Sequence, residues 1–132
     1  MSFHGHVLWT ELNTHHVEAA KAFYGAAFGW TFEAMPIADG STYLLAKPVG
    51  AETPVAGIFE MSDPAFEGMP DHWLSYFGVA DIDAALARVP ALGGQILRPA
   101  WDIPDVGRIA IVRGATGAGE GWMMPPPGMR RG

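Results

Sequence analysis

The sequence predicts an α+β protein made of two tandem βαβββ repeats, because two segments recur in the same order at nearly the same spacing. Residues 17–22 (VEAAKA) return 65 positions later as 82–87 (IDAALA), each after an apolar, strand-like run and before a glycine. Residues 56–61 (AGIFEM) return 62 positions later as 118–123 (AGEGWM). Such ordered self-similarity is typical of a duplicated structural module, here of about 65 residues.

The composition agrees with one domain, residues 1–132, built from these two repeats. A hydrophobic content of 49% in 132 residues is enough for one core. The absence of cysteine excludes disulfides and thiolate metal sites, and no apolar run reaches the length of a membrane span. The first residues do not resemble a secretion signal, so we expect a soluble, cytoplasmic protein. A net charge of −6 argues against nucleic acid as a partner.

The first repeat is predicted to span residues 6–61. An alternating run at 6–13 predicts a strand, which places Trp9, Glu11 and Asn13 on one face. Apolar residues then recur at helical spacing over 16–28, with Thr14 or a neighbour as the cap and Gly29 as the stop. Three further strands are expected at 31–34, 42–47 and 55–61, separated by turns at 38–40 and 48–50.

The second repeat, residues 72–124, follows a linker at 62–71 that contains two prolines and a glycine. A strand is expected at 72–79, and Asp81 is a natural cap for a helix over 82–92 that Gly93 and Gly94 end. Strands are expected at 95–99, 108–113 and 119–124, with 101–107 as a longer connection. The proline-rich tail at 125–132 cannot extend a strand.

Two motifs carry a resemblance to a known superfamily over residues 6–124. The pattern AxxFYxxxFGW at 20–30 follows the first strand, and Asp-Ile-Pro-Asp-Val-Gly-Arg at 102–108 precedes the penultimate strand. Together with the paired repeats, they resemble the vicinal oxygen chelate superfamily, which includes glyoxalase I, bleomycin-resistance proteins and extradiol dioxygenases. The resemblance implies a curved, partly open mixed-sheet barrel with a cleft, often completed in a homodimer.

Metal-dependent members of that superfamily hold a divalent ion with four side chains, one from the first and one from the last strand of each module. The equivalent positions here are Trp9, Phe59, Leu74 and Gly121, of which Trp9 matches Leu74 and Phe59 matches Gly121 across the repeats. None of these residues can ligate a metal, so no cofactor is expected. The alternative is a divalent metal held by displaced ligands. These would come from His4, His6, Glu11, Glu60, His72 and Glu120.

The remaining candidates lie on the strand faces where this fold binds its ligands. Glu11 and Tyr76 occupy matched positions, and a carboxylate beside apolar surface could act as general acid or base with a tyrosine hydroxyl as proton donor. Structural hydrogen bonding is the competing explanation for this pair. The predicted ligand-binding residues are Trp9, Asn13, Phe59, Leu74, Trp101 and Gly121, an aromatic lining that favours a flat, largely apolar molecule.

Three functional hypotheses follow. The first is a resistance-protein-like domain that binds a small, partly aromatic or apolar molecule without metal. The second is a metal-independent isomerase or lyase that uses Glu11 and Tyr76. The third is a metal-dependent glyoxalase- or dioxygenase-type enzyme with displaced ligands. In each case we expect a small-molecule partner and a C2 homodimer, because one pair of modules exposes sheet edges.

Overall fold

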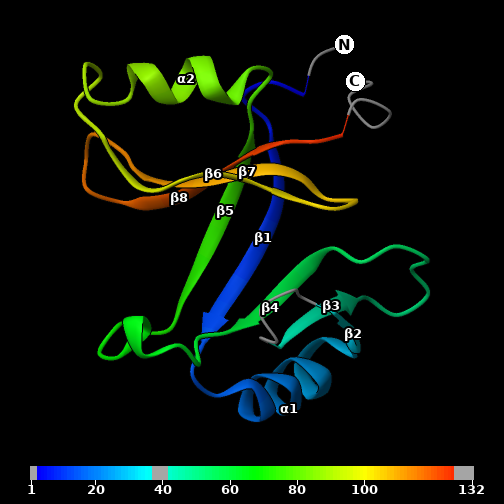
Figure 1. The fold of residues 1–132 in the computed structure, drawn as a ribbon. Helices are drawn as coiled ribbons and strands as arrows, with labels where there is room; N and C mark the ends of the chain where they lie inside the picture. The colour runs from blue at the N-terminus through cyan, green and yellow to red at the C-terminus, as the bar shows by residue number, and fades with distance from the viewer. Residues whose placement is uncertain (1–2, 37–41, 127–132) are drawn as a thin grey trace. The chain divides into compact units, whose positions relative to one another are not determined.

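The computed structural model describes residues 3–36 and 42–126, and it confirms the α+β class and the repeated βαβββ order (Figure 1). The first repeat consists of β1 (Val7–Thr14), α1 (Val17–Phe28), β2 (Thr31–Met35), β3 (Tyr43–Lys47) and β4 (Ala56–Glu60). A short 3-10 helix, Pro64–Phe66, lies in the connection between the repeats. The second repeat consists of β5 (His72–Gly78), α2 (Ile82–Arg88), β6 (Gln95–Ile103), β7 (Gly107–Arg113) and β8 (Gly119–Met124).

The chain divides into two compact units that correspond closely to the repeats. Trp9–Trp73 form the first-repeat unit, and the residues up to Leu8 join those from Leu74 onward in the second-repeat unit. The early segment belongs to the second-repeat unit through its backbone, since Gly5 N–H donates to Gly78 O at 2.8 Å and Gly78 N–H donates to His6 O at 2.7 Å.

The first-repeat unit contains four strands in the order β2-β3-β4-β1, with β1 and β4 parallel and the other pairs antiparallel. Helix α1 covers one face of this sheet. There Val17 and Ala20 pack with Leu12, Leu44 and Ile58. Because strand neighbours alternate between faces, Glu11 and Asn13 lie on the opposite side, which we call the helix-free face of this unit.

Helix α1 begins and ends as the sequence suggests, but its cap differs. Gly29 adopts the left-handed conformation at φ 71°, which ends the helix at low steric cost. The N-cap residue is His16, and its side chain makes no capping hydrogen bond. Thr14 instead accepts the backbone N–H of His16 at 2.9 Å. A neighbour of Thr14 therefore occupies the N-cap position, but the expected side-chain cap is absent, because the Thr14 hydroxyl accepts the N–H of the N-cap residue itself.

The second-repeat unit repeats this design in the order β5-β8-β7-β6, with β5 and β8 parallel and the other pairs antiparallel. Ile82, Leu86 and Val89 from the α2 region pack against Ala110 and Val112 of β7. Asp81 caps α2 as predicted, since its carboxylate accepts the N–H of Ala84 at 3.1 Å.

Two boundaries in this unit differ from the sequence-based expectation. Helix α2 ends at Arg88 rather than at residue 92, because Pro90 has no N–H to continue the helical hydrogen bonds, although Val89 before it keeps right-handed helical angles. Strand β6 continues to Ile103, so residues 101–103 belong to a strand and not to a loop. Two register shifts, between Ile96 and Arg98 and between Arg98 and Trp101, allow the strand to pass Pro99.

The predicted turn at 38–40 lies outside the described residues. No helix in the described part of the chain is long and apolar enough to cross a lipid bilayer.

Candidate functional site

Four of the predicted site residues lie on the helix-free face of the first-repeat unit. The register aligns Asn13 with Phe59, and Phe59 with Tyr43, in one row across the sheet. The next row aligns Glu11 with Gly57. Directly paired residues project from the same face of a sheet. Trp9 is two positions before Glu11 and shares this face, so the structure brings Trp9, Glu11, Asn13 and Phe59 together.

Hydrogen bonds link two of these residues, Trp9 and Glu11, through Tyr43, to which the sequence analysis assigned no role. Trp9 Nε1–H donates to the Tyr43 hydroxyl at 2.9 Å, and that hydroxyl is also hydrogen-bonded to the Glu11 side chain. Gly57 makes this possible, because the Tyr43 ring lies where a Cβ of residue 57 would be, only 2.7 Å from Tyr43 Cε1. We call Trp9, Glu11, Asn13 and Tyr43 the polar cluster.

The environment of Tyr43 keeps its hydroxyl protonated. Burial raises the pKa of Tyr43 far above its ordinary value, and the negative charge of Glu11 raises it further. The hydrogen bond from Trp9 acts in the opposite direction but does not cancel these effects. The Tyr43 hydroxyl is therefore a fixed donor towards Glu11 at neutral pH, which orients the carboxylate.

Asn13 has an unused donor in this cluster. The residue is 7% exposed, and its buried Nδ2 has no hydrogen-bond partner among the described residues. Leaving such an amide unpaired costs about 1–3 kcal/mol. Phe59 lies beside it in the register, and the Phe59 ring packs edge-on against Phe66 at 5.7 Å between centroids. The arrangement presents a hydrogen-bond donor next to aromatic surface.

The other predicted site residues belong to the second-repeat unit. Tyr76 is paired with Gly121, and its ring lies over that glycine, where an added Cβ would be 2.5 Å from Tyr76 Cε2. Leu74 precedes Tyr76 by two positions on the same face and is buried, as is Tyr76 itself. Trp101 lies in β6, paired with Ile109, with the Arg98 guanidinium stacked on its ring. Glu11 and Tyr76 belong to different units, so their joint action stays a prediction.

The register also corrects one correspondence between the repeats. In the parallel pair of each repeat, Glu11 faces Gly57 and Tyr76 faces Gly121. Gly57 is therefore the counterpart of Gly121, and Phe59 is the counterpart of Met123 rather than of Gly121. The recurrence of residues 56–61 at 118–123 suggested the wrong correspondence, because it aligned the first residue of β4 with the residue that precedes β8.

The four positions that would hold the superfamily's metal do not fit one. The side chains of Trp9 and Leu74 offer no ligating atom, and Gly121 and its counterpart Gly57 have no side chain. Phe59, the position expected from the sequence, also offers no ligating atom. Within residues 3–36 and 42–126 there is also no group of three or more histidine, aspartate or glutamate side chains that could hold a metal ion.

Four of the six displaced ligands considered from the sequence lie on a helix-covered face or make other hydrogen bonds. Glu60 is paired with Thr14, so it lies on the α1 side of its sheet. Glu120 is paired with Val112 on the α2 side and accepts a hydrogen bond from Trp122 Nε1 at 2.8 Å. His4 Nδ1 accepts the Ala80 N–H at 3.0 Å, and His72 Nδ1 lies 2.8 Å from Pro70 O.

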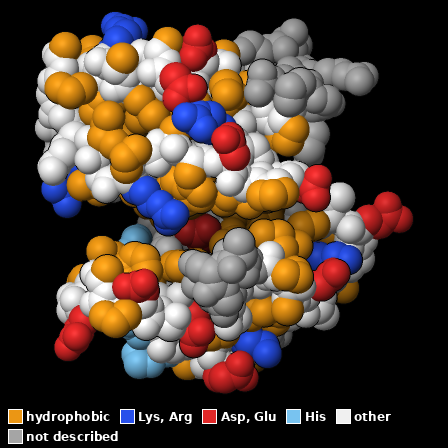
Figure 2. Space-filling view, in the orientation of Figure 1, with side chains coloured by type: hydrophobic (Ala, Val, Ile, Leu, Met, Phe, Trp, Pro, Cys, Tyr) orange, Lys and Arg blue, Asp and Glu red, His pale blue; other side chains and the backbone are white. Residues whose placement is uncertain are grey.

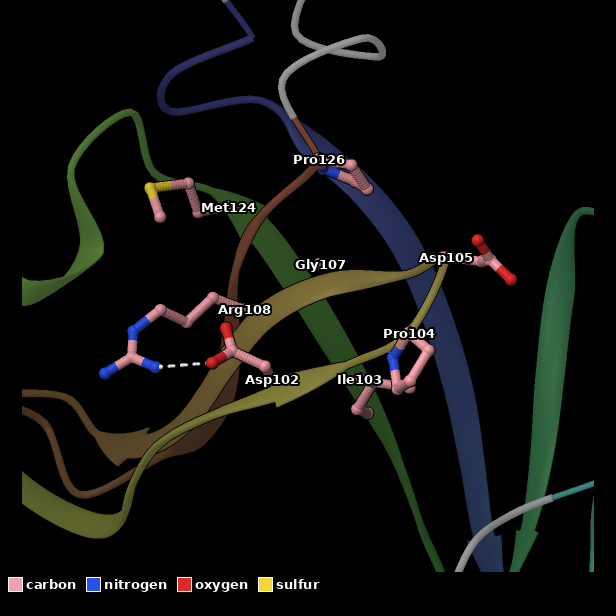
Figure 3. Close-up of a pocket in the computed structure, with 8 residues that line it drawn as sticks. All are labelled: Asp102, Ile103, Pro104, Asp105, Gly107, Arg108, Met124 and Pro126. Carbon is pink, nitrogen blue, oxygen red and sulfur yellow. Dashed lines mark hydrogen bonds and ion pairs between the residues drawn. The ribbon is translucent and has the colours of Figure 1, made fainter.

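Two surface hollows lie apart from the predicted site residues. One, of about 350 Å³, is formed around the β6–β7 turn, where Arg108 is hydrogen-bonded to Asp102 (Figure 3). Arg108 also forms an ion pair with Asp83 of α2 at 3.0 Å, and Figure 2 shows basic and acidic side chains gathered on this unit among hydrophobic ones. The other, of about 680 Å³, is lined by His15, His16 and residues 61–64 and 67–69.

Comparison with known proteins identifies the family. The family model described as the Glyoxalase/Bleomycin resistance protein/Dioxygenase superfamily matches residues 5–119. The candidate glyoxylase CFP32 of Mycobacterium tuberculosis is 41% identical over 123 residues, which cover 93% of this chain and 45% of CFP32. The anthracycline biosynthesis protein DnrV of Streptomyces peucetius is 27% identical over 119 residues, covering 83% of this chain and 43% of DnrV. The chain thus spans about half the length of the curated relatives that it matches.

Solved structures share the fold at low sequence identity. Methylmalonyl-CoA epimerase from Mycobacterium tuberculosis superimposes with a TM-score of 0.66 at 16% identity, over 95% of this chain and 90% of that one. Hypothetical protein BH1468 from Bacillus halodurans C-125 gives a TM-score of 0.68 at 12% identity, over 91% and 94%. The fold, the repeated order of elements and the match over residues 5–119 lead to one conclusion: this chain belongs to the Glyoxalase/Bleomycin resistance protein/Dioxygenase superfamily.

Proposed function

We propose that this protein binds a small, partly aromatic or apolar molecule at the helix-free face of the first-repeat unit, without the divalent metal usual in its superfamily. The observation that carries the proposal is the buried Asn13 Nδ2, which has no partner among the described residues. A ligand with a carbonyl or similar acceptor would satisfy this donor and recover the cost of burying it.

The neighbouring side chains suit such a ligand. Phe59 offers aromatic surface beside Asn13, and Trp9 is held in place by its hydrogen bond to Tyr43. Because Tyr43 and Glu11 are already hydrogen-bonded to each other, they give the site a fixed shape before any ligand arrives. The name of one relative refers to anthracycline biosynthesis, and anthracyclines are polycyclic aromatic compounds, the class of molecule that this surface would accept.

The test uses two neutral probes of nearly the same shape. 2-Acetylnaphthalene carries a carbonyl acceptor, and 2-isopropylnaphthalene does not. We expect the wild-type protein to prefer the acetyl compound by about 5- to 50-fold, the equivalent of about 1–2.3 kcal/mol for one satisfied buried donor. Asn13→Leu should lose this preference while keeping the apolar contacts. The matched control is Gln95→Leu, which removes an exposed amide from β6 together with its hydrogen bond from Arg113 and should leave the preference between the probes unchanged.

The stability of the same variant separates a binding role from a structural one. Because Asn13 Nδ2 makes no hydrogen bond in the described structure, Asn13→Leu should leave the free energy of unfolding unchanged or raise it. A loss of preference together with retained stability supports the proposal. Equal affinity of the wild type for both probes, or a strongly destabilised Asn13→Leu protein, contradicts it.

We propose proton transfer as a second candidate function, with Glu11 as the general base and Tyr76 as its partner. The observation that favours it is the burial of the Glu11 carboxylate, which is 7% exposed and oriented by Tyr43. In heavy water, the base would take a proton from the methyl carbon of 2-acetylnaphthalene and return a deuteron, which NMR follows directly. Deuterium exchange into this methyl group that is faster than in buffer, and that is lost in Glu11→Gln, supports this candidate function. Exchange at the buffer rate contradicts it.

We also propose that the protein acts as a C2 homodimer. The described surface of the first-repeat unit exposes Phe23 and Phe28 of α1 and Trp73 of β5. A second copy of this chain would cover this aromatic surface and bring a second pair of repeats beside the first.

A further inference from the structure

Arg98 and Trp101 form a stacked pair on the sheet of the second-repeat unit. The Cζ atom of Arg98 lies 3.4 Å from the centroid of the Trp101 ring, within the range of a cation–π interaction. Arg98 is paired with Ile111 and Trp101 with Ile109, on the face that α2 does not cover. Arg98 and Trp101 are three positions apart, which would place them on opposite faces of a regular strand. The register shifts on either side of Arg98 bring both residues to the same face.

The stack leaves the edges of the guanidinium group available. A ring contact occupies one planar face of Arg98, while its N–H groups point outward in the plane and no carboxylate pairs with them among the described residues. Arg108, in the neighbouring strand, shows the opposite situation, because Asp83 and Asp102 both bind its guanidinium group. Arg98 is exposed, so stacking on Trp101 holds it in place without neutralising its charge.

Apolar surface adjoins this charge along the same row of the sheet. From Arg98 the register runs to Ile111, then to Gly121, then to Tyr76. Ile111 is half-buried and pairs directly with Arg98, so it offers aliphatic surface beside the guanidinium group, whereas the Tyr76 ring at the far end of the row is buried over Gly121. A ligand that fits this row has a flat apolar body and a planar anionic end.

We propose that Arg98, positioned by Trp101, binds the carboxylate of a small aromatic acid on this face of the second-repeat unit. A carboxylate matches the guanidinium fork with two parallel hydrogen bonds, which a lysine cannot provide. The net charge of −6 also disfavours more highly charged ligands such as phosphate esters. This site shares no residue with the polar cluster, so either proposal can fail without the other.

The experiment compares 2-naphthoate with 2-naphthamide, a neutral compound of the same shape, by calorimetric titration of the full chain. We expect the wild type to bind the naphthoate at least about 10-fold more tightly, as one charge-assisted bidentate contact would give. Arg98→Gln should abolish that preference, and Arg98→Lys should restore only part of it. Trp101→Phe should retain most of it, because a phenyl ring can still support the guanidinium group.

The matched control is Arg88→Gln, which removes the same charge from α2 outside this row. It should bind 2-naphthoate as the wild type does, which excludes a general effect of net charge. A third titration with 2-naphthyl phosphate distinguishes carboxylate from phosphate recognition, and tighter binding of the phosphate would overturn the assignment. The proposal is also overturned if the wild type does not bind 2-naphthoate, binds both naphthyl probes equally, or loses nothing in Arg98→Gln.

Discussion

Replacing Gly57 by alanine should push Tyr43 out of the polar cluster. The added methyl group would meet the hydroxyl and ring of Tyr43, with 2.7 Å to Cε1, so the ring must move away from Trp9 and Glu11. Overpacking of this kind costs about 1–3 kcal/mol. A chain of 132 residues loses about 3–4 °C in Tm per kcal/mol, so the change is easily measured.

The decisive assay is a double-mutant cycle of Gly57→Ala with Tyr43→Ala, using urea unfolding followed by tryptophan fluorescence. Once Tyr43 is removed, the new methyl group has no ring to displace, and alanine should be about 0.5–1 kcal/mol better than glycine in a strand. Gly57→Ala should therefore destabilise the wild type and stabilise the Tyr43→Ala protein. Gly119→Ala is the control, since a Cβ there would have no described atom within 4 Å. Equal effects of Gly57→Ala in both backgrounds would refute this explanation of the cluster.

Three further predictions concern pH, capping and assembly. Burial and the charge of Glu11 raise the pKa of Tyr43 in the folded state, so above about pH 10 only the unfolded state ionises. The contribution of Tyr43 to the free energy of unfolding is therefore complete below about pH 10 and is lost as the pH rises further. Tyr43→Phe should show a shallower loss of unfolding free energy above about pH 10. Asp81→Ala removes the cap of α2 and should cost about 0.5–2 kcal/mol by urea unfolding, with Asp81→Asn recovering most of it. Sedimentation at micromolar concentration should give a dimer, and a stable monomer would remove the proposed assembly.

The repeated βαβββ order could be predicted from the sequence because it depends on local periodicity and on an internal copy of it. Helix α1 ends at Phe28 as expected, since a glycine follows the last apolar residue of the helical pattern. Helix α2 is shorter than expected because the missing N–H of Pro90 ends the helical hydrogen bonds before the glycines that follow are reached. Strand β6 was cut short for a related reason, because Pro99 reads as a strand end unless register shifts accommodate it.

The candidate site was only partly predictable. Alternation along β1 placed Trp9, Glu11 and Asn13 on one face, and the structure retains that arrangement. Tyr43 was missed because its position beside Trp9 depends on the pairing of β3 with β4, which local periodicity does not reveal. A possible signal was Gly57, since a glycine inside a strand often marks the close approach of another group.

We propose that ligands are held by the side chains of the polar cluster and not by a metal ion. The most direct measurement is elemental analysis of untagged protein purified without chelator, followed by calorimetric titration with nickel, zinc, manganese and iron(II). We predict no stoichiometric metal and no micromolar binding, because Trp9, Gly57, Leu74 and Gly121 occupy the positions of the superfamily's metal ligands. Stoichiometric metal that is lost in Glu11→Gln or Glu60→Gln would contradict the claim and indicate a glyoxalase- or dioxygenase-type metal enzyme.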